Sequence, residues 1–251
     1  MKSQSEEKPW FVQWFDENYR TLYSHRNSAE AQKQVRLIIS TLRPAKSRSI
    51  LDLCCGEGRY TALFRDMGYS IIGLDLSETL IRFGKQRDPA LDLVVGDMRA
   101  IPGHFDIILS LFTSFGYFDS DLENETVLHS VYAALRPGGI YWLDFLNPVC
   151  VEQNLVPETL TQISAGIEVL EKRKVENGRI IKDIHFRSVG VKEEEYEQKE
   201  YKESVRLFSR EQLEEMFVRS RLQLLHCFGD YQGHPWSACS ERTILVGRKI
   251  S

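Results

Sequence analysis

Hydrophobic residues follow three different patterns along this chain of 251 residues. Near the N-terminus they recur at helical spacing, which predicts two helices, over residues 9–26 and 35–42. Over residues 49–146, short runs that are apolar on both faces alternate with amphipathic stretches. Strands buried on both faces are typical of parallel sheets covered by helices on each side. Because crossovers between such strands are right-handed, this stretch predicts a doubly wound α/β core.

A β-rich pattern interrupts the core over residues 148–206. Two β-like runs flank Asn177 and Gly178, and an Asn-Gly pair is the strongest short signal for a hairpin. The charged run that follows predicts a third antiparallel strand. The helical pattern resumes at Ser209 and leads into two more strands, so we expect the β-rich part to be an insertion.

The first predicted strand of the core ends in the glycine turn "CCGEG". Gly56 and Gly58 allow a tight turn that brings backbone N–H groups to the carboxyl edge of the sheet. Asp75 ends the second strand, where a carboxylate can accept hydrogen bonds from both hydroxyls of a ribose. Dinucleotide-binding folds use the same pair, but their third glycine falls here on Thr61. The pattern predicts a nucleoside-binding site, with an NAD-dependent oxidoreductase as a less favoured alternative.

The composition narrows the class of partner. A formal net charge of -4 gives no overall attraction to phosphate backbones or anionic membranes. The sequence has no run of about 18 apolar residues, and its N-terminus is polar rather than a secretory signal. We therefore expect a cytoplasmic monomer or homodimer that binds a small molecule, and neither nucleic acid nor a membrane.

The five cysteines predict free thiols rather than a disulfide or metal framework. Their number is odd, and they form no C-x-x-C pair and no ligand spacing with histidine, so no metal is predicted. Side chains of adjacent strand residues point to opposite faces. We expect Cys54 to pack under a helix and Cys55 to border the ligand at the turn.

Four ordered motifs resemble those of class I S-adenosylmethionine-dependent methyltransferases: "ILDLCCGEGRYT", "GLDLS", "VVGDM" and "ALRPGG". The resemblance is clear between about residues 47 and 145, and the last two strands are similar to the family's closing pair. It implies a seven-stranded Rossmann-like sheet with an antiparallel last strand. It also implies S-adenosylmethionine as cofactor and S-adenosylhomocysteine as product.

The same resemblance, to the small-molecule type with an inserted β-rich lid, implies a division of the chain. Residues 1–46 would be helices that cover the cofactor site. Residues 47–147 and 207–251 would form the core. Residues 148–206 would be the lid, where the resemblance is weakest.

At the nucleoside end, the resemblance assigns four residues. Asp75 would bind the ribose hydroxyls, and Leu76 would flank the adenine. Asp97 would accept a hydrogen bond from the adenine amino group, while Met98 would donate its backbone N–H.

At the methionine end, the resemblance implies that Asp52 orders the glycine turn and approaches the amino group. Gly56 and Gly58 would face the methionine and the ribose, and Leu111 and Phe112 would line the sulfonium end. An N-terminal residue would bind the methionine carboxylate. The candidates are Tyr19, Tyr23 and Arg26, of which Tyr23 is preferred.

Methyl transfer is an in-line displacement, so positioning of the acceptor can supply much of the catalysis. A neutral amine needs no base, whereas a hydroxyl or thiol gains from one. Two histidines are candidates: His185, on the polar face of a strand with Asp183 and Arg187, and His234, in a loop whose Tyr231 and Trp236 could close the acceptor pocket. The alternatives are a solvated strand face and a merely structural loop.

The stretch after the fourth core strand, "SLFTSFGYF", lacks the Asn-Pro-Pro-aromatic signature of enzymes that methylate adenine or glutamine. Its aromatic residues suit the wall of a small-molecule pocket or the edge of the core. The sequence therefore predicts an enzyme that methylates an oxygen, nitrogen or carbon atom of a small molecule. The alternative is an S-adenosylmethionine-binding regulatory protein without transfer activity.

Overall fold

The computed structural model describes residues 8–23, 28–164, 166–188 and 198–250. Its larger sheet has the strand order β10-β11-β5-β4-β1-β2-β3. Strands β1 to β5 are parallel, and β11 runs antiparallel to both neighbours, as predicted for the core. The strands are β1 (Ser49–Leu53), β2 (Ser70–Asp75), β3 (Leu93–Val95), β4 (Phe105–Ser110), β5 (Leu135–Leu146), β10 (Leu222–Phe228) and β11 (Arg242–Lys249).

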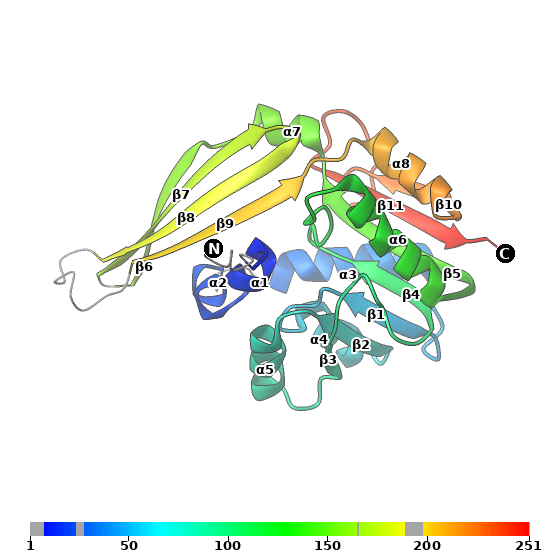
Figure 1. Ribbon diagram of the computed structural model, residues 1–251. Helices are drawn as coiled ribbons and strands as arrows, with labels where there is room; N and C mark the ends of the chain where they lie inside the picture. The colour runs from blue at the N-terminus through cyan, green and yellow to red at the C-terminus, as the bar shows by residue number, and fades with distance from the viewer. Residues whose placement is uncertain (1–7, 24–27, 165, 189–197, 251) are drawn as a thin grey trace, which may run out of the picture.

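Helices cover both faces of this core sheet (Figure 1). Helices α3 and α4 pack on one face, where Val35, Ile38 and Phe64 are buried, and α6 and α8 pack on the other. The helices are α3 (Ser28–Leu42), α4 (Arg59–Asp66), α5 (Glu78–Arg87), α6 (Asp121–Ala134) and α8 (Arg210–Arg219). None of the helices in the described ranges is long and apolar enough to cross a membrane.

A second sheet is inserted between β5 and α8, and four antiparallel strands form it in the order β6-β7-β8-β9. They are β6 (Glu158–Ser164), β7 (Ile167–Glu176), β8 (Arg179–Ser188) and β9 (Lys199–Arg206), preceded by the short helix α7 (Pro148–Gln153). Asn177 and Gly178 form the predicted hairpin turn, with φ of 52° and 68°. Strand β6 was not predicted, because it is largely exposed and lacks a clear alternation of apolar residues.

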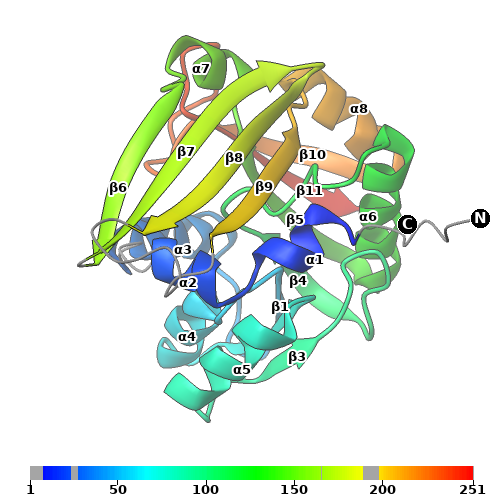
Figure 2. The same cartoon turned by 60° about the vertical axis from the view of Figure 1, so that its left-hand side comes forward.

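The N-terminal stretch forms two short helices between the sheets, α1 (Trp10–Trp14) and α2 (Glu17–Leu22), rather than one (Figure 2). The chain turns at Asp16, whose carboxylate accepts hydrogen bonds from the backbone N–H groups of Asn18 and Tyr19. An N-cap of this kind starts a new helix. Trp14 is fully buried against the second sheet, so α1 and the second sheet share one hydrophobic cluster.

Candidate active site

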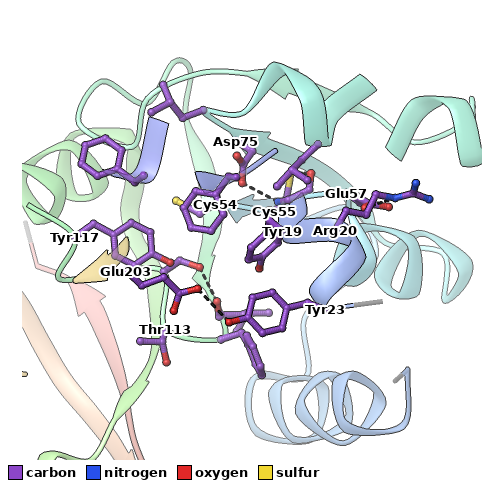
Figure 3. A pocket seen from close by; sticks show the side chains of 18 of the residues that line it. Tyr19, Arg20, Tyr23, Cys54, Cys55, Glu57, Asp75, Thr113, Tyr117 and Glu203 are labelled. Carbon is purple, nitrogen blue, oxygen red and sulfur yellow. Dashed lines mark hydrogen bonds and ion pairs between the residues drawn. The ribbon is translucent and has the colours of Figure 1, made fainter. Parts of the chain in front are cut away.

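A cavity of about 1000 Å³ lies at the carboxyl edge of the core strands, enclosed by α1, α2 and the second sheet. Three surfaces bound it (Figure 3). We call the ends of β1 and β2 with their following turns the floor, the segment after β4 the side wall, and the inner face of the second sheet the inner wall. Aromatic side chains of α1 and the side wall close the space between them.

The floor is organised around the Asp75 carboxylate. Its two oxygens accept hydrogen bonds from the backbone N–H groups of Gly56 and Ser77, each at 2.8 Å. Burial raises the pKa of Asp75 above its ordinary value, although these two hydrogen bonds act to lower it. The carboxylate thus ties the glycine turn to the end of β2 and keeps further lone pairs for a ligand.

Asp52 is the second acid of the floor and is almost fully buried. It accepts hydrogen bonds from the backbone N–H and the hydroxyl of Thr61, at 3.1 and 2.7 Å, and so fixes the first turn of α4. Burial raises the pKa of Asp52 to about 6. The chain therefore holds an acid with a perturbed pKa at a cavity wall, which is typical of functional sites.

The side wall carries backbone strain. Phe112 and Thr113 have φ of 58° and 65°, in the left-handed region that residues other than glycine seldom adopt. The buried Asp144 on β5 holds this shape, because its carboxylate accepts a hydrogen bond from the Phe112 N–H at 3.0 Å and its carbonyl accepts one from the Thr113 N–H at 3.1 Å. The strain is thus fixed by a neighbouring core strand.

Asp144 is itself held by two side chains. Arg242 donates Nε to one carboxylate oxygen at 2.8 Å and Nη2 to the Thr113 hydroxyl at 2.8 Å, while Tyr231 donates its hydroxyl to the other oxygen at 3.0 Å. Although burial alone would lower it, the Asp144 charge raises the pKa of Arg242 above its ordinary value. A buried ion pair therefore supports the side wall.

The inner wall carries a row of charges. In the strand register, Arg173 on β7 lies opposite Lys182 on β8, and Lys182 lies opposite Glu203 on β9. The three side chains therefore lie side by side on one face of the sheet. All three line the cavity. We call Arg173, Lys182 and Glu203 the inner charged row. Beside it on the same face of β7, the buried Glu171 forms ion pairs with Arg173 at 2.8 Å and with Lys182 at 3.4 Å.

Helices α1 and α2 contact this row. Glu203 accepts hydrogen bonds from the Trp14 indole at 2.6 Å and the Tyr23 hydroxyl at 3.1 Å, and its other oxygen pairs with Lys182 at 3.0 Å. The Tyr23 hydroxyl also accepts a hydrogen bond from Lys182. Figure 3 shows Tyr23 and Glu203 facing each other across this contact. The N-terminal helices and the second sheet therefore meet through polar groups at the cavity.

Comparison with known proteins shows similarity to methyltransferases. A family model described as a methyltransferase domain matches residues 50–139. The putative methyltransferase YqeM of Bacillus subtilis is 28% identical over 245 residues, which are 94% of this chain and 96% of that protein. The chain therefore carries a methyltransferase domain.

Two further proteins are similar to this methyltransferase. The dTDP-3-amino-3,4,6-trideoxy-alpha-D-glucopyranose N,N-dimethyltransferase of Streptomyces venezuelae is 30% identical over 147 residues, 58% of each chain. A crystal structure of an S-adenosylmethionine-dependent methyltransferase from Clostridium acetobutylicum matches with a TM-score of 0.79 and 17% identity, over 93% of this chain and 98% of that one. The similarity to the Clostridium acetobutylicum structure shows that the two proteins share a fold.

The methyl donor of this family fits the floor. S-adenosylmethionine carries hydroxyl and amino donors and a positive sulfonium, and the floor offers buried carboxylates. At Gly56, a Cβ would come no closer than 3.9 Å to its nearest neighbour, on Leu80, so the backbone leaves open space beside the Asp75 carboxylate. The glycine turn therefore allows a ligand to approach both the Gly56 backbone and the Asp75 carboxylate closely.

Most residues predicted to bind the cofactor meet at this cavity of the methyltransferase. They are Tyr23, Asp52, Cys55, Gly56, Asp75, Leu76, Asp97, Met98, Leu111 and Phe112. Their individual roles remain predictions. The Asp97 carboxylate also forms a salt bridge with Arg99 at 2.6 Å. Tyr19 lines the cavity as well, whereas Arg26 lies outside the described residues.

The structure differs from the expectations for the turn at two residues, Gly58 and Cys54. Gly58 does not line the cavity; it caps α4 with φ of 75°, and a Cβ there would lie 2.8 Å from Leu93. Its role is close packing against β3. Cys55 lines the cavity and also packs with Ile81 in an apolar cluster, whereas Cys54, expected to pack under a helix, lines the cavity too and is the more exposed of the two. Burial raises the pKa of both thiols, so neither is a ready nucleophile.

For His185 the structure agrees with the alternative of a solvated strand face. The face of β8 that meets α1 and the cavity carries Ile184, Phe186 and Lys182, while His185 points the other way and pairs with Glu200 at 3.1 Å. The sequence did hold a signal for the inner charged row, because Lys182 falls in phase with the buried residues of its strand. A charge at an inward position marks a group that faces a cavity.

The loop between β10 and β11 does not close the main cavity either. His234 pairs with Asp230 at 2.6 Å and lines a separate hollow of about 410 Å³ with Ser237 and Cys239. Neither Tyr231 nor Trp236 lines the main cavity. Among the residues that the structure describes, no three His, Cys, Asp or Glu side chains gather as a metal-binding group.

Proposed function

We propose that this methyltransferase transfers the methyl group to a nitrogen atom of a small, polar acceptor held beneath the second sheet. The observation that carries the proposal is the continuous cavity of about 1000 Å³, which extends from the floor to the inner charged row. An enclosed site lined by aromatic and charged side chains is typical of small-molecule enzymes. The acceptor would lie on the inner-wall side and the cofactor on the floor.

A nitrogen acceptor is favoured by the groups at hand. None of the histidines in the described part of the chain lines the cavity, and burial raises the pKa of Tyr117 well above its usual range. A neutral amine can attack without a base, whereas a hydroxyl gains from one. The relative from Streptomyces venezuelae is named as an N,N-dimethyltransferase of an amino sugar, which supports an amine on a sugar-like acceptor.

In this proposal the floor holds S-adenosylmethionine, which supplies an activated methyl group on a sulfonium. Asp75 would accept hydrogen bonds from the ribose hydroxyls and Asp52 from the amino group. The strained Phe112 backbone would fix the side wall so that the acceptor approaches in line. Trp10, Phe15 and Tyr117 pack with ring centroids 4.9 to 5.9 Å apart and would exclude water from the transfer.

The proposal also gives each part of the chain a task. Residues 1–46 would cover the cofactor, and residues 148–206 would be the lid that carries the acceptor subsite. Residues 47–147 and 207–251 would form the core that positions the methyl donor.

The test is methyl transfer with a matched pair of acceptors. The protein is incubated with S-adenosylmethionine carrying a labelled methyl group, and with either a dTDP-linked 3-amino sugar or the same sugar with a hydroxyl in place of the amine. We expect mass spectrometry to detect the label on nitrogen in the first and no product in the second. Transfer to oxygen at an equal rate would contradict the proposed acceptor atom.

A further inference from the structure

The inner face of the second sheet is mostly apolar, and the inner charged row interrupts it. On β8, Ile180 and Ile184 flank Lys182, and on β9, Tyr201 and Val205 flank Glu203. The side chains of the inner charged row are 16 to 20% exposed, and they face the cavity. Four charges, counting Glu171, therefore stand where the surrounding pattern calls for hydrophobic residues.

Stability does not explain this arrangement. A buried ion network is often no more stabilising than hydrophobic residues of the same volume, because the charges lose their hydration. Glu171 shows how tightly the network is balanced: burial alone would raise its pKa, but Lys182 and Arg173 hold the pKa below its ordinary value. Two cations and two carboxylates leave the network with no net charge. It offers strong donors and acceptors side by side without attracting an anion or a cation as such.

We propose that the inner charged row is the acceptor subsite and that it binds the hydroxyl groups of a hydroxyl-rich amine. This inference rests on the proposed function and adds the residues that select the acceptor. A hydroxyl both donates and accepts a hydrogen bond. Neighbouring hydroxyls can therefore accept from Arg173 or Lys182 and donate to Glu203, which cross-strand register places next to one another.

Aromatic side chains complete the subsite. Trp10, Phe15, Tyr19 and Tyr117 line the same cavity and form a packed group, with Phe15 and Tyr19 centroids 4.9 Å apart. Flat rings can pack against the apolar face of a sugar-like ring while the charged row binds its hydroxyls. Trp14 also donates to Glu203 and so orients that carboxylate.

The experiment measures acceptor binding to the protein saturated with S-adenosylhomocysteine. The probes are a dTDP-linked 3-amino sugar and cyclohexylamine, which has an amine but no hydroxyl, and calorimetry gives their affinities. We expect the amino sugar to bind at least tenfold more tightly than cyclohexylamine. Glu203→Gln and Lys182→Met should each weaken amino sugar binding at least tenfold, while the affinity for S-adenosylhomocysteine stays within about twofold.

The opposite face of the same two strands provides the control. Glu200 lies on β9 three residues from Glu203 and pairs with its cross-strand neighbour His185, away from the cavity. Glu200→Gln should leave both affinities unchanged. Arg173→Lys keeps the charge but loses the planar guanidinium, so it should also weaken amino sugar binding, and it serves if Glu203→Gln does not fold.

The outcomes separate the inference from the proposed function. If Glu203→Gln and Lys182→Met behave like Glu200→Gln, or if the wild type binds the two probes equally well or not at all, the inference is overturned. If the wild type binds the amino sugar through the row but methylates an oxygen atom, the inference stands and the nitrogen acceptor is wrong.

Discussion

The floor of the cavity is made by residues of one β-α-β unit, whereas its inner wall is made by residues that meet through strand register. In the floor, backbone groups of the glycine turn bind the Asp75 carboxylate from within a single β-α-β unit. In the inner wall, Arg173, Lys182 and Glu203 come from three strands and are neighbours because of how those strands pair. One surface depends on turn geometry and the other on the identity of individual side chains.

This difference indicates which surface of the cavity can determine selectivity for the acceptor. A floor built from backbone N–H groups and a buried acid suits a ligand that stays the same throughout a family. A wall built from side chains on an antiparallel sheet can change one residue at a time without altering the backbone. The side wall stands between them, and its shape depends on one buried ion pair.

The largest effect is expected where that ion pair is broken. Arg242→Met leaves the buried Asp144 without its cation, which should lower the free energy of unfolding by about 3 to 5 kcal/mol. Urea denaturation measures the change. The matched control is Arg219→Met, since Arg219 is half exposed and pairs with Glu125, and it should cost less than about 1 kcal/mol. Equal effects of the two substitutions would show that the side wall does not depend on the buried pair.

A smaller effect is expected on the floor. Asp75→Ala removes the carboxylate that accepts hydrogen bonds from Gly56 and Ser77 and is predicted to bind the ribose. It should weaken the binding of S-adenosylhomocysteine by about 1.5 to 3 kcal/mol, the range for charge-assisted hydrogen bonds. Calorimetry checks this value, and Glu203→Gln on the inner wall should leave the same affinity nearly unchanged. A loss of affinity in Glu203→Gln alone would reverse the assignment of the two surfaces.

The raised pKa of Asp52 predicts a pH dependence that belongs to the floor alone. Its pKa is about 6 in the folded protein and 3.8 as the ordinary value, so between these values the folded state binds more protons. Stability contributed by the protonated form is therefore lost as the pH rises. From pH 5 to 7.5 the wild type should lose about 1 kcal/mol of unfolding free energy relative to Asp52→Asn. Parallel pH profiles of the two proteins would contradict the raised pKa.

The sequence predicts the floor well because its determinants are local. Asp75 and Gly56 are marked by their positions at strand ends, and the order of the motifs fixes the sheet that joins them. The surroundings of Gly58 could not be predicted, because a glycine spacing does not tell whether the missing Cβ faces a ligand or, as here, Leu93. Close packing and close approach of a ligand both require a glycine, so the sequence does not distinguish them.

The inner wall could be predicted only in part. The Asn177-Gly178 hairpin is a local signal, but which face of β8 meets the cavity depends on the packing of α1, and Trp14 decides it. Polar residues on one face suggested a site at His185, whereas the buried face with Lys182 turned inward. The pairing of Asp144 with Arg242 spans distant strands, so no local pattern indicates it.

The smallest effect is expected on the outer face of the second sheet. His185→Gln removes the histidine that the strand pattern offered as a base, but the side chain faces away from the cavity and pairs with Glu200. Methyl transfer should change by less than twofold, or about 0.4 kcal/mol, because no group at the cavity loses a contact. Lys182→Met, three residues away on the inner face, should reduce transfer at least tenfold in the same assay. A larger loss in His185→Gln than in Lys182→Met would mean that the two faces of the sheet exchange roles during turnover.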